Sequence, residues 1–320
     1  MAWLIRGVLF LAVATLAWTS RASVLAVIPP ALLGLSPHEH HALVIRARGL
    51  HETPEGRAWI RDADAALDGP HAVRAPFTTS GNIGATGSGA MAWRFSARRG
   101  QRLIAHAQFA AGETFIDLID SEERTVVASG TASQAPLVYD VPRDSELVLR
   151  LQPELQRAGP FTLTQVARAS LDFPVQDVSG RAIQSVFGDG RDDGRRRHEG
   201  VDIFAARGTP AVAAVDGFVV GATTNRLGGN VVWLWSPSRS ITLYYAHLDR
   251  QAVSPGARVR AGDVVGYVGN TGNARSTSPH LHFGIYARAE GAVDPAPFIV
   301  DPVQGERLMH PAKRSGKGLQ

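Results

Sequence analysis

The chain has 320 residues, which is enough for two domains, and its 44% hydrophobic and 19% charged residues are ordinary for a globular protein. It has no cysteine, which excludes disulfides, thiolate metal ligands and a cysteine nucleophile, so any metal site must use histidine and carboxylate. The net charge of +4 suits contact with an anionic polymer, but no stretch interleaves basic and aromatic residues, so we expect no nucleic-acid partner.

Residues 1–22 form a hydrophobic N-terminal segment. Arg6 precedes a charge-free apolar run over residues 7–20, which has the length of a signal-peptide core and falls short of the roughly 20 residues of a membrane span. Ser20 and Ala22 provide a small-x-small cleavage pattern, although further apolar residues follow. We expect an exported, periplasmic protein whose N-terminus is either a cleaved signal peptide or a retained anchor that contacts the inner membrane.

Residues 23–69 are predicted to form a helical linker. The stretches SPHEHHALVIRARGL and TPEGRAWIRDADAAL each begin with a capping residue followed by proline. The first stretch also carries His38, His40 and His41, which could trap a metal ion. We interpret these three histidines as the solvated first turn of a helix.

Residues 70–168 are predicted to form a β-sandwich, because apolar residues alternate with polar ones over several short segments. RRGQRLIAHA, FIDLIDSEERTVV, SELVLRL and GPFTLT resemble in pattern the jelly-roll modules of secreted peptidases, which implies a fold and no activity. The alternating apolar residues are Met91, Trp93, Phe95, Leu103, Ala105, Ala107, Leu147, Leu149, Leu151, Phe161 and Leu163.

The segment ASLDFPVQ separates this sandwich from a second β-rich region over residues 180–302. There VVWLW and ITLYYAH are separated by SPSRS and are predicted to pair as a hairpin, and Gly-rich turns join further strands. No helical period of useful length appears in this region. The basic residues 303–320 are predicted to be a disordered tail.

The motif HEGVD places His198 and Asp202 four positions apart. Gly200 lies between them and β-branched residues follow, so the motif is predicted to be a loop that enters a strand near Asp202. Such a pair can be a surface ion pair, a helix N-cap or two ligands of one metal ion.

SPHLHF carries two further histidines at strand spacing. His280 and His282 would point to the same side of a strand, with Cα atoms about 7 Å apart. His247 ends ITLYYAH on the face that alternation also assigns to Leu243 and Tyr245. With the HEGVD pair these residues supply four imidazoles and one carboxylate, whereas a catalytic Zn²⁺ typically has three protein ligands and an open position. Two groups would therefore be left for catalysis.

HEGVD, GTPAVAAVDGFVV, GGNVVWLW, YYAHL, VRAGDVVGYVGNTG and SPHLHF, in this order, resemble the lysostaphin/LytM-type zinc metallopeptidases of family M23. The resemblance covers roughly residues 183–300 and implies an antiparallel β-sheet peptidase domain. It makes His198, Asp202 and His282 the Zn²⁺ ligands and His247 and His280 the catalytic histidines, one accepting a proton from water and the other stabilising the oxyanion or protonating the leaving amine. Asn230 and Tyr245, which lie near these motifs, are predicted to contact substrate.

The resemblance is incomplete in three places near the motifs. NARSTS precedes PHLHF where the family has SSTG-like text, Gly284 stands in place of the usual glutamate after HLHF, and RDDGRRR crowds the first ligand. The first two differences concern the shape of the groove and leave the ligand set intact. The arginines 195–197 could bind substrate carboxylates or form a solvated basic loop.

These features predict an exported zinc metalloendopeptidase that hydrolyses peptide cross-links of bacterial peptidoglycan, with stem peptides as partners. A bond between D-Ala and a diamino acid is favoured over a Gly-Gly bridge. The alternative is a non-catalytic wall-binding regulator that activates an amidase, although regulators of this type lack one or more of the five residues. A secreted enzyme that lyses other bacteria would share the chemistry. We also expect the sandwich to restrain the hydrolase by packing over or beside its groove, and a regulatory partner to open it.

Overall fold

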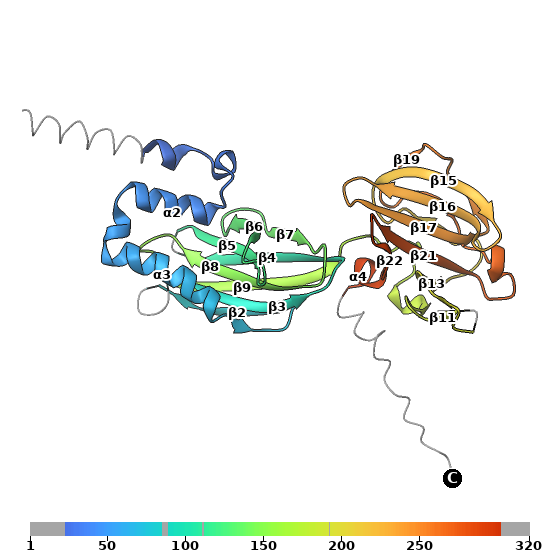
Figure 1. Cartoon of the computed structure of the whole chain (residues 1–320), viewed down its shortest axis with the longest axis horizontal. Helices are drawn as coiled ribbons and strands as arrows, with labels where there is room; N and C mark the ends of the chain where they lie inside the picture. Colours follow the sequence, from blue (N-terminus) through green and yellow to red (C-terminus); the bar gives the residue numbers. More distant parts are fainter. Residues whose placement is uncertain (1–22, 85–88, 111, 192, 302–320) are drawn as a thin grey trace, which may run out of the picture. The chain divides into compact units, whose positions relative to one another are not determined.

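The computed structural model describes residues 23–84, 89–110, 112–191 and 193–301, which divide into two compact units. Unit 1 contains the described residues before 98 and residues 103–167, and unit 2 contains residues 98–102 and those from 168 onward. Strands dominate both units, which confirms the predicted fold class (Figure 1). The predicted signal or anchor segment and the predicted tail lie outside the described residues. Within those residues, no helix is long and apolar enough to cross a membrane.

Two helices of unit 1 start at the capping residues seen in the sequence. Ser36 accepts a hydrogen bond from the backbone N–H of Glu39, whose carboxylate accepts one from the Ser36 N–H in return. Thr53 caps the next helix by accepting from the Gly56 N–H. The helices are η1 (Pro30–Leu33), α2 (Pro37–Ala47), η2 (Leu50–Glu52) and α3 (Pro54–Asp68).

Helices α2 and α3 pack on one sheet of the sandwich, as Figure 1 shows, so they belong to unit 1 and not to a free-standing linker. Ile45, Trp59 and Phe115 form a shared apolar cluster, and the Trp59 indole N–H donates to the Pro153 carbonyl at 2.8 Å. His38 is only 6% exposed and is hydrogen-bonded inside this interface. The interpretation of this histidine as part of a solvated turn is therefore wrong.

The sandwich of unit 1 has two sheets, ordered β1-β3-β8-β5-β6 and β2-β9-β4-β7. Its strands are β1 (His71–Ala72), β2 (Phe77–Ile83), β3 (Met91–Ala97), β4 (Gln101–Phe109), β5 (Thr114–Asp120), β6 (Val126–Thr131), β7 (Leu137–Asp140), β8 (Ser145–Pro153) and β9 (Gly159–Ala169).

The alternating residues of the sequence form the core between these sheets. Trp93 lies directly opposite Leu149, and Phe95 lies opposite Leu147, across the β3–β8 ladder. Leu163, from the other sheet, contributes to the same cluster and is fully buried. Period-two patterning therefore identified the inward faces correctly.

Unit 2 contains the region in which the metal-site motifs were found. Its elements are η3 (Gly180–Ala182), β10 (Ile183–Ser185), β11 (Gly190–Arg191), β12 (Arg196–Arg197), β13 (Val201–Phe204), β14 (Pro210–Val212), β15 (Gly217–Asn225), β16 (Gly229–Ser236), β17 (Ile241–Leu248), β18 (Arg250–Gln251), β19 (Arg258–Val259), β20 (Val264–Tyr267), η4 (Gly272–Ala274), β21 (His280–Ala287), β22 (Gly291–Val293) and α4 (Ala296–Ile299).

The main sheet of unit 2 has the order β10-β13-β21-β17-β16-β15-β19, with β22 pairing to β21. β16 and β17 pair antiparallel, which confirms the predicted hairpin. One face of this sheet is fully buried and includes Ile203, Leu243, Tyr245 and Phe283. The opposite face carries the site described next.

Candidate metal centre

The pairing of β13 with β21 places two motif residues side by side. Asp202 lies directly opposite His282 in this antiparallel ladder, so both side chains project from the same face. The alternate residues Ile203 and Leu281 are fully buried in the core on the other face. The apolar positions of the two motifs therefore anchor the strands, and the polar positions between them build the site.

His198 reaches the same point from the loop before β13. Its N–H donates to the Asp189 carbonyl and its carbonyl accepts from the Gly188 N–H, both at 2.8 Å, which fixes the loop. Gly200 allows β13 to approach β21, because a Cβ at this position would lie 2.5 Å from the Phe283 carbonyl oxygen and 2.8 Å from the His282 ring.

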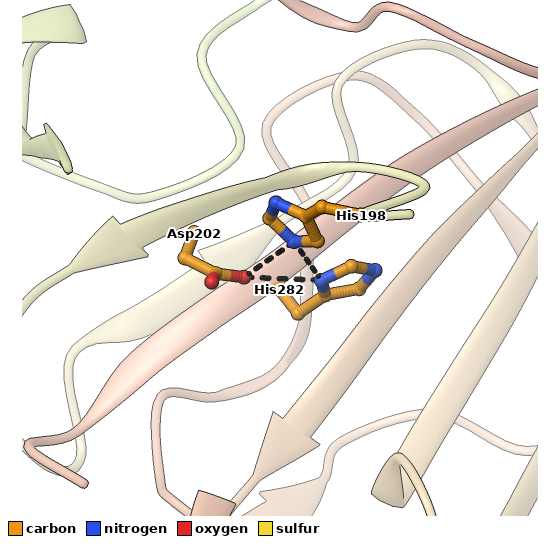
Figure 2. Close-up of side chains that lie close together, drawn as sticks. All are labelled: His198, Asp202 and His282. Carbon is orange, nitrogen blue, oxygen red and sulfur yellow. Dashed lines mark hydrogen bonds and ion pairs between the residues drawn. The ribbon is translucent and has the colours of Figure 1, made fainter. Parts of the chain in front are cut away.

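Three ligand-type atoms converge in this arrangement (Figure 2). His198 Nε2 lies 2.9 Å from His282 Nδ1, and both nitrogens lie 3.0 Å from Asp202 Oδ1. A tetrahedral site with bonds of about 2.0–2.1 Å has edges of about 3.3 Å between ligand atoms. The three atoms thus have nearly the spacing of one face of such a site.

The hydrogen-bond partners of His198 show why a cation fits here. Its Nδ1 lies 2.9 Å from the Val186 carbonyl oxygen, which can only accept, so Nδ1 carries the proton and Nε2 is a bare acceptor. Asp202 Oδ1 is also an acceptor, and neutral His282 can supply one proton to this group of three atoms. A metal ion at the centre would satisfy all three at once.

His280 and His247 flank this trio. The Nδ1 of His280 lies 2.9 Å from the Ser278 carbonyl, and the Nδ1 of His247 lies 2.9 Å from the Thr271 carbonyl. By the same reasoning both Nε2 atoms are bare, and that of His280 lies 4.0 Å from Asp202 Oδ1. The His247 and His280 rings are 5.1 Å apart.

The face on which His247 lies differs from the sequence prediction. Strict alternation puts it on the buried face with Leu243 and Tyr245, yet its ring lies beside His280 and His282 on the open face. His247 has a φ of 61°, a left-handed conformation that interrupts the alternation at the end of β17. This local backbone change brings the fifth motif residue into the site.

Burial and neighbouring rings set the protonation of the site. Burial, reinforced by His282 and His280, lowers the pKa of His247 to about 4. Burial also lowers the pKa of His282. Burial would raise the pKa of Asp202, but the neighbouring His198 and His282 rings hold it well below its usual range. These residues are therefore in the deprotonated forms that bind metal or accept a proton at neutral pH.

A cavity of about 400 Å³ opens over these residues. Asp202 and all four histidines line it, together with Arg191 and Arg196 from the β11–β12 hairpin. The other lining residues are Ser185, Phe204, Leu227, Gly228, Tyr244, Ala246, Asn273, Ala274 and Thr277.

Two residues of this lining that contact the trio were not predicted. Arg191 donates to Asp202 Oδ2 at 2.8 Å and to Ser185 Oγ at 2.6 Å, and Ser185 Oγ also lies 3.2 Å from His198 Nδ1. The sequence showed Arg191 only as part of a crowded basic loop. Its role depends on the β11–β12 turn, which no sequence motif marked.

The prediction that Tyr245 and Asn230 contact substrate requires correction. Tyr245 is fully buried and its hydroxyl accepts a hydrogen bond from the Ala214 N–H, whereas the preceding residue, Tyr244, lines the cavity. The Asn230 amide donates to the Leu248 and Asp249 carbonyls and is not part of the cavity lining. Both side chains therefore hold the strands in place.

Comparisons with known proteins show what this chain is similar to. Residues 196–295 match the model of peptidase family M23. The glycyl-glycine endopeptidase ALE-1 of Staphylococcus capitis is 37% identical over 123 residues, which cover 37% of this chain and 33% of that protein. The peptidoglycan DD-endopeptidase ShyC of Vibrio cholerae is 36% identical over 120 residues, covering 38% of this chain and 26% of ShyC. This chain thus spans about a third or less of the length of these relatives.

A solved structure is similar to a part of this chain. The catalytic domain of lysostaphin from Staphylococcus simulans is 35% identical, covers 36% of this chain and 88% of its own, and has a TM-score of 0.33. The family match begins at Arg196 in β12 and extends past His282, so it contains all five motif residues. Residues 196–295, within unit 2, therefore resemble peptidase family M23.

Proposed function

We propose that this chain is an exported zinc metalloendopeptidase that hydrolyses peptide cross-links of bacterial peptidoglycan. The observation that carries the proposal is the convergence of His198 Nε2, Asp202 Oδ1 and His282 Nδ1 within 3.0 Å, beside two further histidines. These are the donor types of a catalytic zinc site, which keeps a position open for water or substrate. The M23 match supports a peptidase.

His198, Asp202 and His282 would hold the Zn²⁺, because their donor atoms already face one another. Zinc in such a site supplies Lewis acidity, which polarises a carbonyl group and acidifies water. The Nδ1–H···O=C bond from His198 to Val186 fixes its ring for this role. His282 would bind through Nδ1, which lies 3.0 Å from the other proposed ligand atom Asp202 Oδ1.

His247 and His280 would perform the proton transfers. Each is anchored through Nδ1 to a backbone carbonyl and presents an unprotonated Nε2 towards the open face. A neutral imidazole accepts a proton, and the resulting imidazolium then donates it to the leaving amine. Because burial lowers the pKa of His247 to about 4, this residue is ready to accept at neutral pH.

Stem peptides are the proposed substrate and the periplasm is the proposed location. The names of the two relatives specify different bonds, glycyl-glycine in ALE-1 and a DD bond in ShyC. The absence of cysteine and the hydrophobic N-terminal sequence fit export to a Gram-negative periplasm. For that wall we favour a bond between D-Ala and a diamino acid.

Digestion of purified peptidoglycan by the chain without its first 22 residues tests this proposal. We expect cross-linked dimers to disappear, and the products are identified by mass. A chelator and the His280→Ala substitution should each prevent this loss of dimers. An intact sacculus after treatment with folded, zinc-loaded protein would point to an enzyme restrained by unit 1, and the same result with a zinc-loaded chain beginning at Arg168 would contradict the proposed hydrolysis. The same result from a protein that binds no zinc would favour the wall-binding regulator.

A further inference from the structure

The second carboxylate oxygen of Asp202 has its own partner. Oδ1 faces His198 and His282, while Oδ2 accepts a 2.8 Å hydrogen bond from the Arg191 guanidinium. We propose that Arg191 is a positioning residue that holds Asp202 as a one-oxygen ligand of the metal. This inference rests on the proposed metal centre and goes beyond it by assigning the residue that sets its coordination.

The fold holds Arg191 at this place from two sides. Gly190 and Arg191 pair with Arg196 and Arg197 in a two-stranded hairpin, which fixes the backbone beside β13. The same guanidinium nitrogen that contacts Asp202 also donates to Ser185 Oγ at 2.6 Å. The Arg191 side chain is 28% exposed and that of Asp202 is 13% exposed, so the pair is shielded from most solvent.

Ser185 links this arginine to a second ligand of the trio. Its hydroxyl accepts from Arg191 and donates to Asp189 Oδ2 at 2.8 Å, and its remaining lone pair faces His198 Nδ1 at 3.2 Å. Each donor in this chain of contacts therefore faces an acceptor. Arg191 and Ser185 therefore orient the aspartate and one histidine together.

The effect of this contact follows from carboxylate chemistry. A carboxylate with both oxygens free can turn and bind a cation with one oxygen or with two. A charge-assisted hydrogen bond from Arg191 to Oδ2 competes with metal binding by this oxygen, so binding through Oδ1 alone is favoured. One-oxygen binding favours the four-coordinate geometry of zinc, and partners of this kind typically change metal affinity by about 10- to 100-fold.

Metal titration of the full chain tests the inference without relying on activity. Metal-free wild-type protein and the variants Arg191→Gln, Arg191→Lys and Arg196→Gln are titrated with Zn²⁺ and with Co²⁺, whose visible spectrum reports coordination number. Arg196 is the matched control, because it lies opposite Arg191 in the same hairpin, lines the same cavity and removes the same charge when replaced. Circular dichroism checks that each variant is folded.

We expect Arg191→Gln to bind both metals about 10- to 100-fold more weakly and to give a Co²⁺ spectrum of higher coordination number. Arg191→Lys, which keeps a cation that can bond Oδ2, should recover most of the affinity, and Arg196→Gln should resemble the wild type. Unchanged affinity and spectrum in Arg191→Gln would overturn the positioning role. Equal losses in Arg191→Gln and Arg196→Gln would also overturn it, since net charge would then be the cause. A wild-type protein that binds neither metal would instead refute the metal centre itself.

Discussion

Hydrogen bonds within the fold fix which ring nitrogen each histidine presents to the site. Three of the four use Nδ1 to donate to a backbone carbonyl, and these are His198, His247 and His280. His282 alone points Nδ1 into the trio. The carbonyl partners thus fix which nitrogen these three rings present, while proximity to Asp202 Oδ1 separates the proposed ligands His198 and His282, both at 3.0 Å, from His280 at 4.0 Å.

Alanine substitutions should separate these two roles. His282→Ala removes a ligand and is expected to abolish stoichiometric zinc binding. His247→Ala and His280→Ala should retain zinc and lose about 10²- to 10⁴-fold in hydrolysis rate, the usual contribution of a positioned acid or base. Bound zinc per protein and release of dimer products are measured for each variant. Loss of zinc in His280→Ala would show that this residue is a ligand instead.

Gly200 gives a second prediction at the residue scale. A Cβ there would meet the Phe283 carbonyl and the His282 ring, so Gly200→Ala should push β13 from β21 and weaken zinc binding by at least 10-fold. Gly190→Ala is the control, because a Cβ added at Gly190 would have its nearest neighbouring heavy atom 3.9 Å away and the φ of Gly190 is not positive. Equal zinc affinity in both variants, measured by competition with a chelating dye, would contradict this account.

The sequence identified the members of the site better than their orientation. His198, Asp202, His280 and His282 were found because they belong to short motifs next to strands of clear period. His247 was placed on the wrong face, because a left-handed φ at a non-glycine residue cannot be read from alternation. Arg191 and Ser185 were missed because no sequence motif marks the β11–β12 hairpin that carries Arg191 or the β10–β13 pairing that places Ser185 opposite Asp202.

Among the elements, α2 is held by a buried polar group as well as by apolar contacts. The His38 ring hydrogen-bonds to Gln152 at 2.6 Å and accepts from Arg150 at 3.0 Å, and it stacks on Trp59. These partners are 112 and 114 residues away along the chain, so no local pattern could have predicted the burial. The strands of the sandwich, whose partners follow from period and alternation, were predictable.

Acid should loosen α2 because the folded state excludes a proton that the unfolded state binds. Burial, with a contribution from Arg150, lowers the pKa of His38 from 6.5 to about 3. The packing of α2 on the sheet is therefore fully stable above pH 6.5 and weakens as the pH falls from 6.5 towards 3. At pH 5 the free energy that stabilises this packing is lower by about 2 kcal/mol. His41, whose pKa burial lowers to about 4, acts in the same direction.

Hydrogen exchange at pH 7 and pH 5, corrected for intrinsic rates, measures this effect. The protection of α2 amides should fall at pH 5, while that of β9, which carries no histidine, provides an internal reference within the same unit. His38→Gln should reduce the acid sensitivity, and His40→Gln, in the same helix with its ring on the Leu25 carbonyl, should keep it. Equal α2 protection at both pH values would rule out the proposed linkage.

At the scale of the whole molecule, the two units share one chain but have separate cores. The boundary between the units lies at Arg168, just before the segment ASLDFPVQ that the sequence indicated. Leu171 is buried in the core of unit 2 and its N–H donates to the Phe298 carbonyl, and the Ala169 N–H donates to Asp301. A truncated protein should therefore begin at Arg168.

The prediction that the sandwich restrains the hydrolase belongs to this scale. A domain joined through a short connection is present at an effective concentration near millimolar, so even a weak inhibitory contact would suppress the attached enzyme. A chain beginning at Arg168 should then digest peptidoglycan faster than residues 23–320, at equal zinc content. Unit 1 added in trans should inhibit it only near millimolar concentration. Equal rates for the two proteins would exclude restraint by the sandwich and would leave its role to be sought in wall binding.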